Sequence, residues 1–393
     1  MKIVLVPSGF KECIDAEKVG LAMERGAKKF DDRNEIEMIP MVDGGEGFAK
    51  TITKTKEGEM IYGDVRGPVG DPVTAHIGIY VENGERIAVI EMAAAAGLKL
   101  VPLNQRNPLK TTTHGVGELI LCALDYDVDR ILIGCGDSGT SDGGAGMAEA
   151  LGVRFMDDLN HTVKINGVED IIKVRHIDMS QLDPRIADVV IDVACNWTNV
   201  LCGEKGVARV FGPQKGATPQ QVDLLSAALE HFANLIEKAF SIDMRLTPGS
   251  GASGGLGTGL VAFAKATLHP RFDVIKRYIQ MEQKIKEADI VFTAEGSIDF
   301  QTPNGKIPTE VARIAKKYDK PVVAITGTIG KGAKLNYEVG IDAFISIIPK
   351  PTSLQKAMEH ASKWIEGSME SVLRQVTIGY QMAKRKPDDE KVS

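Results

Sequence analysis

Five glycine-rich stretches of this chain carry the side chains best suited to chemistry. They occupy residues 7–11, 43–47, 134–146, 248–259 and 295–301. Glycine lets a backbone bend freely and approach a ligand closely, and backbone N–H groups that lead into a helix attract an anion. One such stretch also fits a plain turn between a strand and a helix. Five of them favour a binding site for phosphate or carboxylate groups.

The polar residues in and near these stretches match a ligand with several phosphates and a divalent ion. Carboxylates can bind Mg²⁺ or take a proton, whereas ammonium groups and hydroxyls can bind phosphate oxygens. The predicted bases or Mg²⁺ ligands are Asp43, Asp142 and Asp299, and Glu46 and Glu295 are second-ranked candidates for the same roles. The predicted phosphate partners are Lys11, which we place in the catalytic group, Lys215 and Lys306. The predicted hydroxyl contacts are Ser138, Thr140 and Ser253.

Familiar catalytic signatures are missing from the sequence. It contains no GxxxxGK[ST] or HExxH pattern. A GxGxxG pattern at residues 249–254 does not follow a clear strand, so this match does not support a dinucleotide-binding fold. The five cysteines lack CxxC spacing, so we expect reduced thiols. These absences leave the glycine-rich stretches as the main functional signal.

The elements that must position these stretches alternate between strand and helix. Buried strands are predicted at residues 2–6 and 35–40, and the same rhythm returns after residue 287. The part between contains a predicted hairpin around Asn83-Gly84. We therefore predict an α/β protein with two α/β domains. One is a discontinuous Rossmann-like domain (1–62 plus 283–382), the other an inserted mixed-sheet domain (63–282), and residues 383–393 form a polar tail.

Composition narrows the partners and the location. The net charge of −6 gives no general attraction to nucleic acid or to an anionic membrane. No apolar stretch reaches the roughly 18 residues that span a bilayer, and the apolar run at the N-terminus is too short for a signal peptide. We expect a cytoplasmic protein with a small-molecule partner. The oligomeric state stays open, with a homodimer among the alternatives.

Taken together, the motifs resemble the class I glycerate kinase family over nearly the whole chain. The two most specific strings are Asp-Gly-Gly-Glu-Gly at residues 43–47 and Phe-Gly-Pro-Gln-Lys-Gly-Ala at residues 211–217. The resemblance implies ATP-dependent phosphorylation of D-glycerate, usually at the 2-hydroxyl to give 2-phosphoglycerate, with Mg²⁺. It also implies a site between two α/β domains.

The chain departs from the family pattern at several positions, namely Ser8, Gly9, Asp137, Gly139, Ser141, Asn196 and Ser297. Asn196, a predicted substrate or nucleotide contact, replaces an aspartate, and Ser297 replaces an arginine. Arginine is the natural bidentate partner of a substrate carboxylate, so the second change bears on the choice of substrate. The alternatives are a kinase of another small hydroxy acid or sugar acid, and a homologue that binds a metabolite without catalysis.

Overall fold

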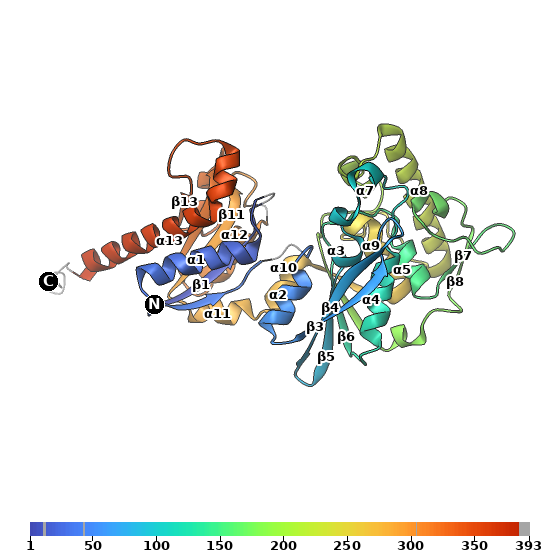
Figure 1. Cartoon of the computed structure of the whole chain (residues 1–393), viewed down its shortest axis with the longest axis horizontal. Helices are drawn as coiled ribbons and strands as arrows, with labels where there is room; N and C mark the ends of the chain where they lie inside the picture. The colour runs from blue at the N-terminus through green and yellow to red at the C-terminus, as the bar shows by residue number, and fades with distance from the viewer. Residues whose placement is uncertain (11–12, 42–43, 304, 385–393) are drawn as a thin grey trace, which may run out of the picture. The chain divides into compact units, whose positions relative to one another are not determined.

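The computed structural model describes residues 1–10, 13–41, 44–303 and 305–384 (Figure 1). The chain divides into two compact units, unit 1 (Met1–Val42 with Ile279–Ser393) and unit 2 (Asp43–Tyr278). We predicted the division after residues 62 and 282. It falls earlier because α2 (Phe48–Thr55) packs on the strands of unit 2, and β3 (Glu59–Arg66) pairs with β4 (Pro72–Glu82).

Unit 1 is built on a five-stranded parallel sheet. Its strands are, in spatial order, β13 (Ala343–Ser346), β12 (Val322–Ile329), β11 (Ile290–Ile298), β1 (Lys2–Pro7) and β2 (Glu35–Met38). Counted along the chain within this unit, the order is 2-1-3-4-5. That order belongs to flavodoxin-like doubly wound sheets rather than to the classic dinucleotide-binding order, and its switch point lies between β1 and β11.

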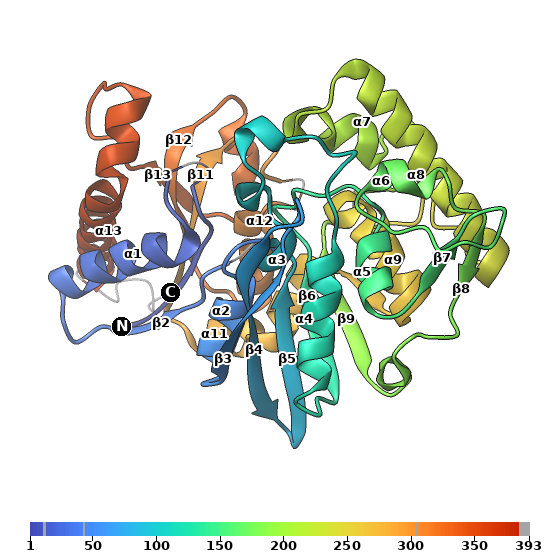
Figure 2. The same cartoon turned by 45° about the vertical axis from the view of Figure 1, so that its right-hand side comes forward.

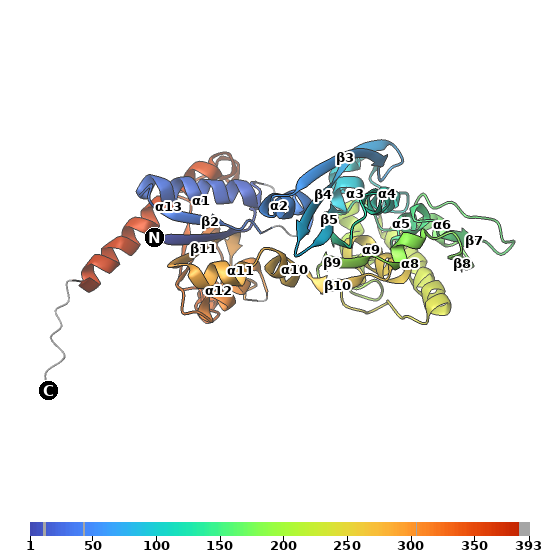
Figure 3. The ribbon, with the colours of Figure 1, turned by 90° about the horizontal axis from the view of Figure 1, so that it is seen from below.

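Helices cover both faces of this sheet. The helices of unit 1 are α1 (Ala16–Phe30), α11 (Met281–Glu287), α12 (Ile307–Lys316) and α13 (Leu354–Lys384). Apolar residues of α1 and α13 share one core with alternate residues of β1, β11 and β12, while α11 and α12 pack on the other face (Figure 3). Because both faces are covered, the central strands are apolar along their length.

Unit 2 contains a six-stranded mixed sheet. Its strands are, in spatial order, β10 (Thr267–Pro270), β9 (Val190–Cys195), β6 (Arg130–Gly134), β5 (Glu85–Glu91), β4 and β3. The strands β3, β4 and β5 are antiparallel, and the others run parallel to β5. Asn83 and Gly84 have φ values of 53° and 85°. These left-handed residues form the predicted hairpin turn.

The helices of unit 2 pack on this sheet and beside it. They are α2, α3 (Ala93–Ala96), α4 (His114–Leu124), α5 (Ala145–Ala150), α6 (Val168–Ile171), α7 (Val207–Phe211), α8 (Pro219–Phe240), α9 (Ala252–Ala264) and α10 (Arg271–Tyr278). A second core forms around α8 and the small sheet of β7 (Arg154–Met156) and β8 (His176–Asp178) (Figure 2). Among the described residues, no helix combines the length and apolar character needed to cross a membrane.

Two of the predicted loops are partly regular structure. Residues 252–259 belong to α9, which is kinked where Ser253, Gly254 and Gly255 have left-handed backbone angles. Residues 295–298, the first part of the stretch at 295–301, extend β11. Glycine and small polar residues hide both elements from sequence patterns, because those patterns rest on apolar periodicity.

Candidate active site

Three of the five glycine-rich stretches meet within unit 2, and their backbones touch. A Cβ atom added to Gly136 would lie 2.6 Å from the Gly45 nitrogen. One added to Gly254 would lie 2.0 Å from the Thr140 carbonyl oxygen. We expected the glycines to admit a ligand. Many of them instead pack against other backbone segments of the protein, because backbones can approach this closely only where no side chain intervenes.

Lys215 reaches one of these stretches from outside it. Its side chain is buried, and its Nζ donates to Ser138 Oγ at 2.9 Å and to the Thr140 carbonyl at 2.5 Å. Ser141 Oγ lies 3.4 Å away. Burial lowers the pKa of Lys215 to about 7, and the nearby Asp142 carboxylate opposes that shift. We predicted that the Lys215 ammonium group and the loop of residues 134–146 would both bind phosphate. In the structure the ammonium group instead binds this loop.

Asp142 is also committed inside the protein. Its side chain is fully buried and accepts hydrogen bonds from the Thr113 N–H at 2.8 Å and the Thr113 hydroxyl at 2.9 Å. The N–H groups of Gly144 and Gly146 donate to it at 3.2 Å and 3.1 Å. Burial raises its pKa, and these hydrogen bonds oppose the rise. A catalytic base must reach the substrate, and a metal-binding carboxylate must reach the metal ion. The enclosed Asp142 side chain instead suits a carboxylate that organises the loop.

Sequence reasoning missed Thr113, which joins this loop to the start of α4. Its hydroxyl both donates to Asp142 and accepts from the Met147 N–H at 2.9 Å. The available signal was the run of three threonines at residues 111–113, directly before a predicted helix. Threonine is common at such helix starts because its hydroxyl bonds to backbone groups.

The remaining predicted residues of unit 2 vary in accessibility. Asn196 Oδ1 accepts from the Thr198 hydroxyl at 2.9 Å, which closes a local turn. Glu46 is exposed and pairs with Lys99. The hydroxyl oxygens of Thr140 and Ser253 are buried without a hydrogen-bond partner among the described residues. The structure thus gathers Ser138, Thr140, Lys215 and Asp142 and ties Asn196 into its own loop.

The other two glycine-rich stretches meet in unit 1, at the switch point of its sheet. Ser8 follows β1, and its hydroxyl lies 2.7 Å from the Ala294 carbonyl and 2.9 Å from Glu295 Oε2. In doubly wound sheets, ligands bind at the carboxyl ends of strands beside this point. Ser8 and Glu295 therefore occupy the position in unit 1 where the topology favours a ligand.

Asp299 lies just beyond the end of β11 and is partly exposed. The pKa of Asp299 is lowered overall. Burial by itself would raise this pKa, but two effects outweigh burial: the hydrogen bond from the Gln301 N–H at 2.8 Å and the positive charge of Lys306. Lys306 Nζ lies 3.5 Å from Asp299 Oδ1. Asp299 is consequently anionic at neutral pH and stands beside a cation.

Two predicted residues, Lys11 and Asp43, lie outside the described residues. Within the part that is described, no group of three or more His, Cys, Asp or Glu side chains is arranged to hold a metal ion. Mg²⁺ in kinases commonly uses one or two protein carboxylates and completes its shell with phosphates and water. The anionic, partly exposed Asp299 fits that requirement, and the enclosed Asp142 does not.

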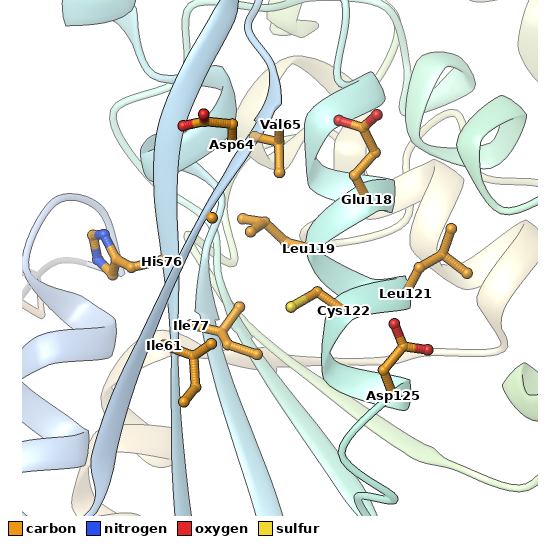
Figure 4. A pocket seen from close by; sticks show the side chains of 11 residues that line it. Ile61, Asp64, Val65, His76, Ile77, Glu118, Leu119, Leu121, Cys122 and Asp125 are labelled. Atoms are coloured by element: carbon orange, nitrogen blue, oxygen red, sulfur yellow. The ribbon is translucent and has the colours of Figure 1, made fainter.

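A separate pocket of about 310 Å³ lies in unit 2 between α4 and the outer strands β3 and β4 (Figure 4). Its lining is mainly apolar and includes Val65, Leu119 and Cys122. None of the predicted site residues lines it. Its carboxylates Glu118 and Asp125 already bond to the Arg66 N–H and the Arg185 guanidinium. The chemistry predicted from the sequence is therefore elsewhere.

Comparison with known proteins shows the family to which the chain belongs. The family model described as "Glycerate kinase family" matches residues 3–377. A glycerate kinase from Bacillus subtilis (strain 168) is 43% identical over 384 residues, which are 98% of this chain and 99% of the relative. The chain belongs to the glycerate kinase family. It is therefore a kinase that transfers a phosphoryl group to an alcohol, and the family implies ATP as donor and a small-molecule acceptor.

Other members of the glycerate kinase family show how far the likeness extends. A "Glycerate 2-kinase" from Escherichia coli (strain K12) is 39% identical over 98% of this chain and 100% of its own length. The crystal structure of a glycerate kinase 2 from Salmonella typhimurium LT2 has a TM-score of 0.82 and 39% identity. It covers 97% of this chain and 99% of that chain. The predicted family and the α/β fold class are both confirmed.

Proposed function

We propose that this protein transfers the γ-phosphoryl group of ATP to the 2-hydroxyl of D-glycerate and forms 2-phosphoglycerate. The observation that carries this proposal is the full-length similarity to a relative named glycerate 2-kinase, at 39% identity. Two sets of polar residues at strand ends, one in each unit, support it. Each set offers the residue types that phosphoryl transfer uses.

In unit 1, Asp299 and Lys306 are the proposed contacts for the metal–nucleotide complex. Asp299 is kept anionic by its hydrogen bonds, and Lys306 supplies a nearby positive charge. When bound, Mg²⁺ would neutralise charge on the phosphates. Glu295, oriented by the Ser8 hydroxyl, is a second carboxylate at the same sheet edge.

In unit 2, Lys215 and Asp142 act by fixing the loop of residues 138–146. Lys215 holds the loop at Ser138 and Thr140, and Asp142 holds it at Gly144 and Gly146. The half-buried Ser138 then presents its hydroxyl and backbone from a rigid frame. Such preorganised donors stabilise developing charge without reorganising during the reaction.

The position of the new phosphate ester tests the proposal. Purified protein is incubated with Mg-ATP and D-glycerate, and the product is examined by proton-coupled ³¹P NMR. In 2-phosphoglycerate the phosphorus couples to one methine proton and gives a doublet. In the 3-phosphate it couples to a methylene group and gives a triplet. A triplet would show that the 3-hydroxyl is the acceptor.

A kinase of another small hydroxy acid is the second candidate. It is favoured by Ser297, which stands where the family pattern has an arginine, and by Asn196, whose side-chain oxygen is used within its own loop. A panel of hydroxy acids and sugar acids under the same conditions ranks the substrates by kcat/KM. ATP binding in calorimetry without turnover of any panel member would instead indicate a homologue that binds without catalysis.

A further inference from the structure

Arg106 is a half-buried arginine whose Nε atom is buried and has no hydrogen-bond partner among the residues that the structure describes. Within the described part of the chain, no hydrogen bond or ion pair involves its side chain. A guanidinium group stays charged at all physiological pH values and carries five N–H donors. Buried polar groups in proteins are nearly always paired, so the buried Nε and the Nη groups beside it offer donors to an anionic ligand.

The surroundings of Arg106 connect it to the loop of unit 2. The Leu98 N–H donates to the Asp137 carbonyl at 2.8 Å, so the segment that leads to Arg106 starts beside that loop. At the other end, a Cβ atom on Gly216 would lie 2.4 Å from the Arg106 carbonyl oxygen. Gly216 directly follows Lys215. The Arg106 backbone is thus packed against the neighbour of the lysine that holds Ser138 and Thr140.

The backbone next to Arg106 is held firmly. The side-chain oxygen of Asn107 accepts from the Leu109 N–H at 3.1 Å and from Gln221 Nε2 at 3.3 Å. Gln221 also takes part in the capping box at the start of α8. The backbone that carries Arg106 therefore loses little freedom when a ligand binds, and the cost of ordering falls on the side chain.

We propose that Arg106 binds the carboxylate of the hydroxy-acid substrate. This inference rests on the proposed function, since it assigns the acid group of that substrate to one residue. A carboxylate is small and planar, so it can meet the buried Nε and the adjacent Nη side by side in a bidentate pair. A residue that binds this carboxylate affects the affinity for the hydroxy acid and does not affect the affinity for the nucleotide.

The test compares Arg106→Gln and Arg106→Lys with the native protein. For Arg106→Gln we expect KM for D-glycerate to rise about 100-fold, because two charge-assisted hydrogen bonds are lost, while KM for ATP changes less than about threefold. Arg106→Lys should keep part of the affinity, and added guanidinium ion should partly rescue Arg106→Gln. The matched control is Arg209→Gln on the neighbouring α7, where Arg209 pairs with Asp223 at 3.4 Å. It should leave both KM values unchanged.

Each other outcome decides against the proposal. A rise in KM for ATP alone would make Arg106 a phosphate ligand, and unchanged KM values in a normally folded variant would leave it no role in binding. If native protein turns over no glycerate, the proposed function fails first. The comparison is then made by calorimetry with the acid from the panel that binds best. Equal affinity of native protein and Arg106→Gln for that acid, or binding of no acid at all, overturns the inference.

Discussion

The three N–H donors of the Lys215 ammonium group face three oxygens of one loop, on Ser138, Thr140 and Ser141. This match favours the charged form, whereas burial favours the neutral one. Asp142, buried close by, adds a negative charge that supports the ammonium. The residues that we predicted from the sequence to contact the ligand or to take part in the reaction thus stabilise the conformation of this loop.

The titration of Lys215 predicts a measurable pH dependence. Its pKa is about 7 in the folded protein against 10.5 for an ordinary lysine. Between these values the unfolded chain binds the extra proton, so the free energy of unfolding should rise with pH. Lys215→Met removes this contribution. We expect the stability of native protein relative to Lys215→Met, from urea unfolding at pH 7, 8 and 9, to increase steadily. A constant difference would show that Lys215 keeps its ordinary pKa.

Asp299 is the carboxylate that we propose as a contact of the metal–nucleotide complex. Asp299→Asn removes the negative charge proposed to meet the metal–nucleotide complex, so kcat should fall by about 100-fold or more. The melting temperature should hardly change, because Asp299 is partly exposed. The matched control is Asp319→Asn, an exposed residue with φ of 52° that asparagine tolerates well. Near-native turnover of Asp299→Asn would remove Asp299 from the mechanism.

At the scale of elements, the contact between α9 and the loop before α5 is made by glycines. Gly144 and Gly259 face each other, and a Cβ on Gly144 would lie 2.9 Å from the Gly259 Cα. Gly254 meets the Thr140 carbonyl in the same way. The loop that Lys215 holds on one side is therefore supported by α9 on another.

Gly254→Ala should disrupt this contact. Gly254 has φ of +74°, and the new Cβ would lie 2.0 Å from the Thr140 carbonyl oxygen. The strained backbone and the clash should lower the free energy of unfolding by about 2 kcal/mol or more and reduce activity as well. Gly63→Ala on β3 is the control, since no atom lies within 4 Å of its added Cβ. Equal stability of the two variants in chemical unfolding would contradict the backbone contact.

At the scale of the whole molecule, each unit has its own sheet and its own core. Unit 2 is a single stretch of chain, Asp43–Tyr278, with a six-stranded sheet and apolar clusters around α4 and α8. Unit 1 needs both ends of the chain, because β1 from the N-terminal part pairs with β11 from the C-terminal part. Unit 2 is therefore the part that depends least on the rest of the chain.

We expect the fragment Asp43–Tyr278 to fold alone. The apolar clusters around α4 and α8 lie entirely within the fragment, so it should unfold in one cooperative transition followed by circular dichroism. A fragment of residues 63–282, cut at the boundaries predicted from sequence, lacks α2 and part of β3. It should melt at a lower temperature. Equal melting temperatures, or no cooperative transition in the longer fragment, would contradict this division.

The sequence by itself determined the family, the α/β class and the existence of an inserted part. Contiguous strings such as Asp-Gly-Gly-Glu-Gly identify a family without any coordinates, and alternating strand and helix patterns are local properties. Most element positions follow for the same reason, including the hairpin at Asn83-Gly84. The boundaries of the inserted unit could not be predicted from the sequence, because β3 belongs to this unit through its pairing with β4 rather than through its own residues.

Only the tertiary structure decided which polar residues remain available for chemistry. Asp142 meets Thr113, and Lys215 meets Ser138, although each pair is far apart in the sequence. Arg106 belongs to no sequence motif, whereas the fold buries its Nε without a hydrogen-bond partner among the described residues. Burial and pairing depend on which distant segments come together, and motif spacing along the chain carries no record of that. The physical difference between a ligand-binding residue and a structural one is therefore set by the fold.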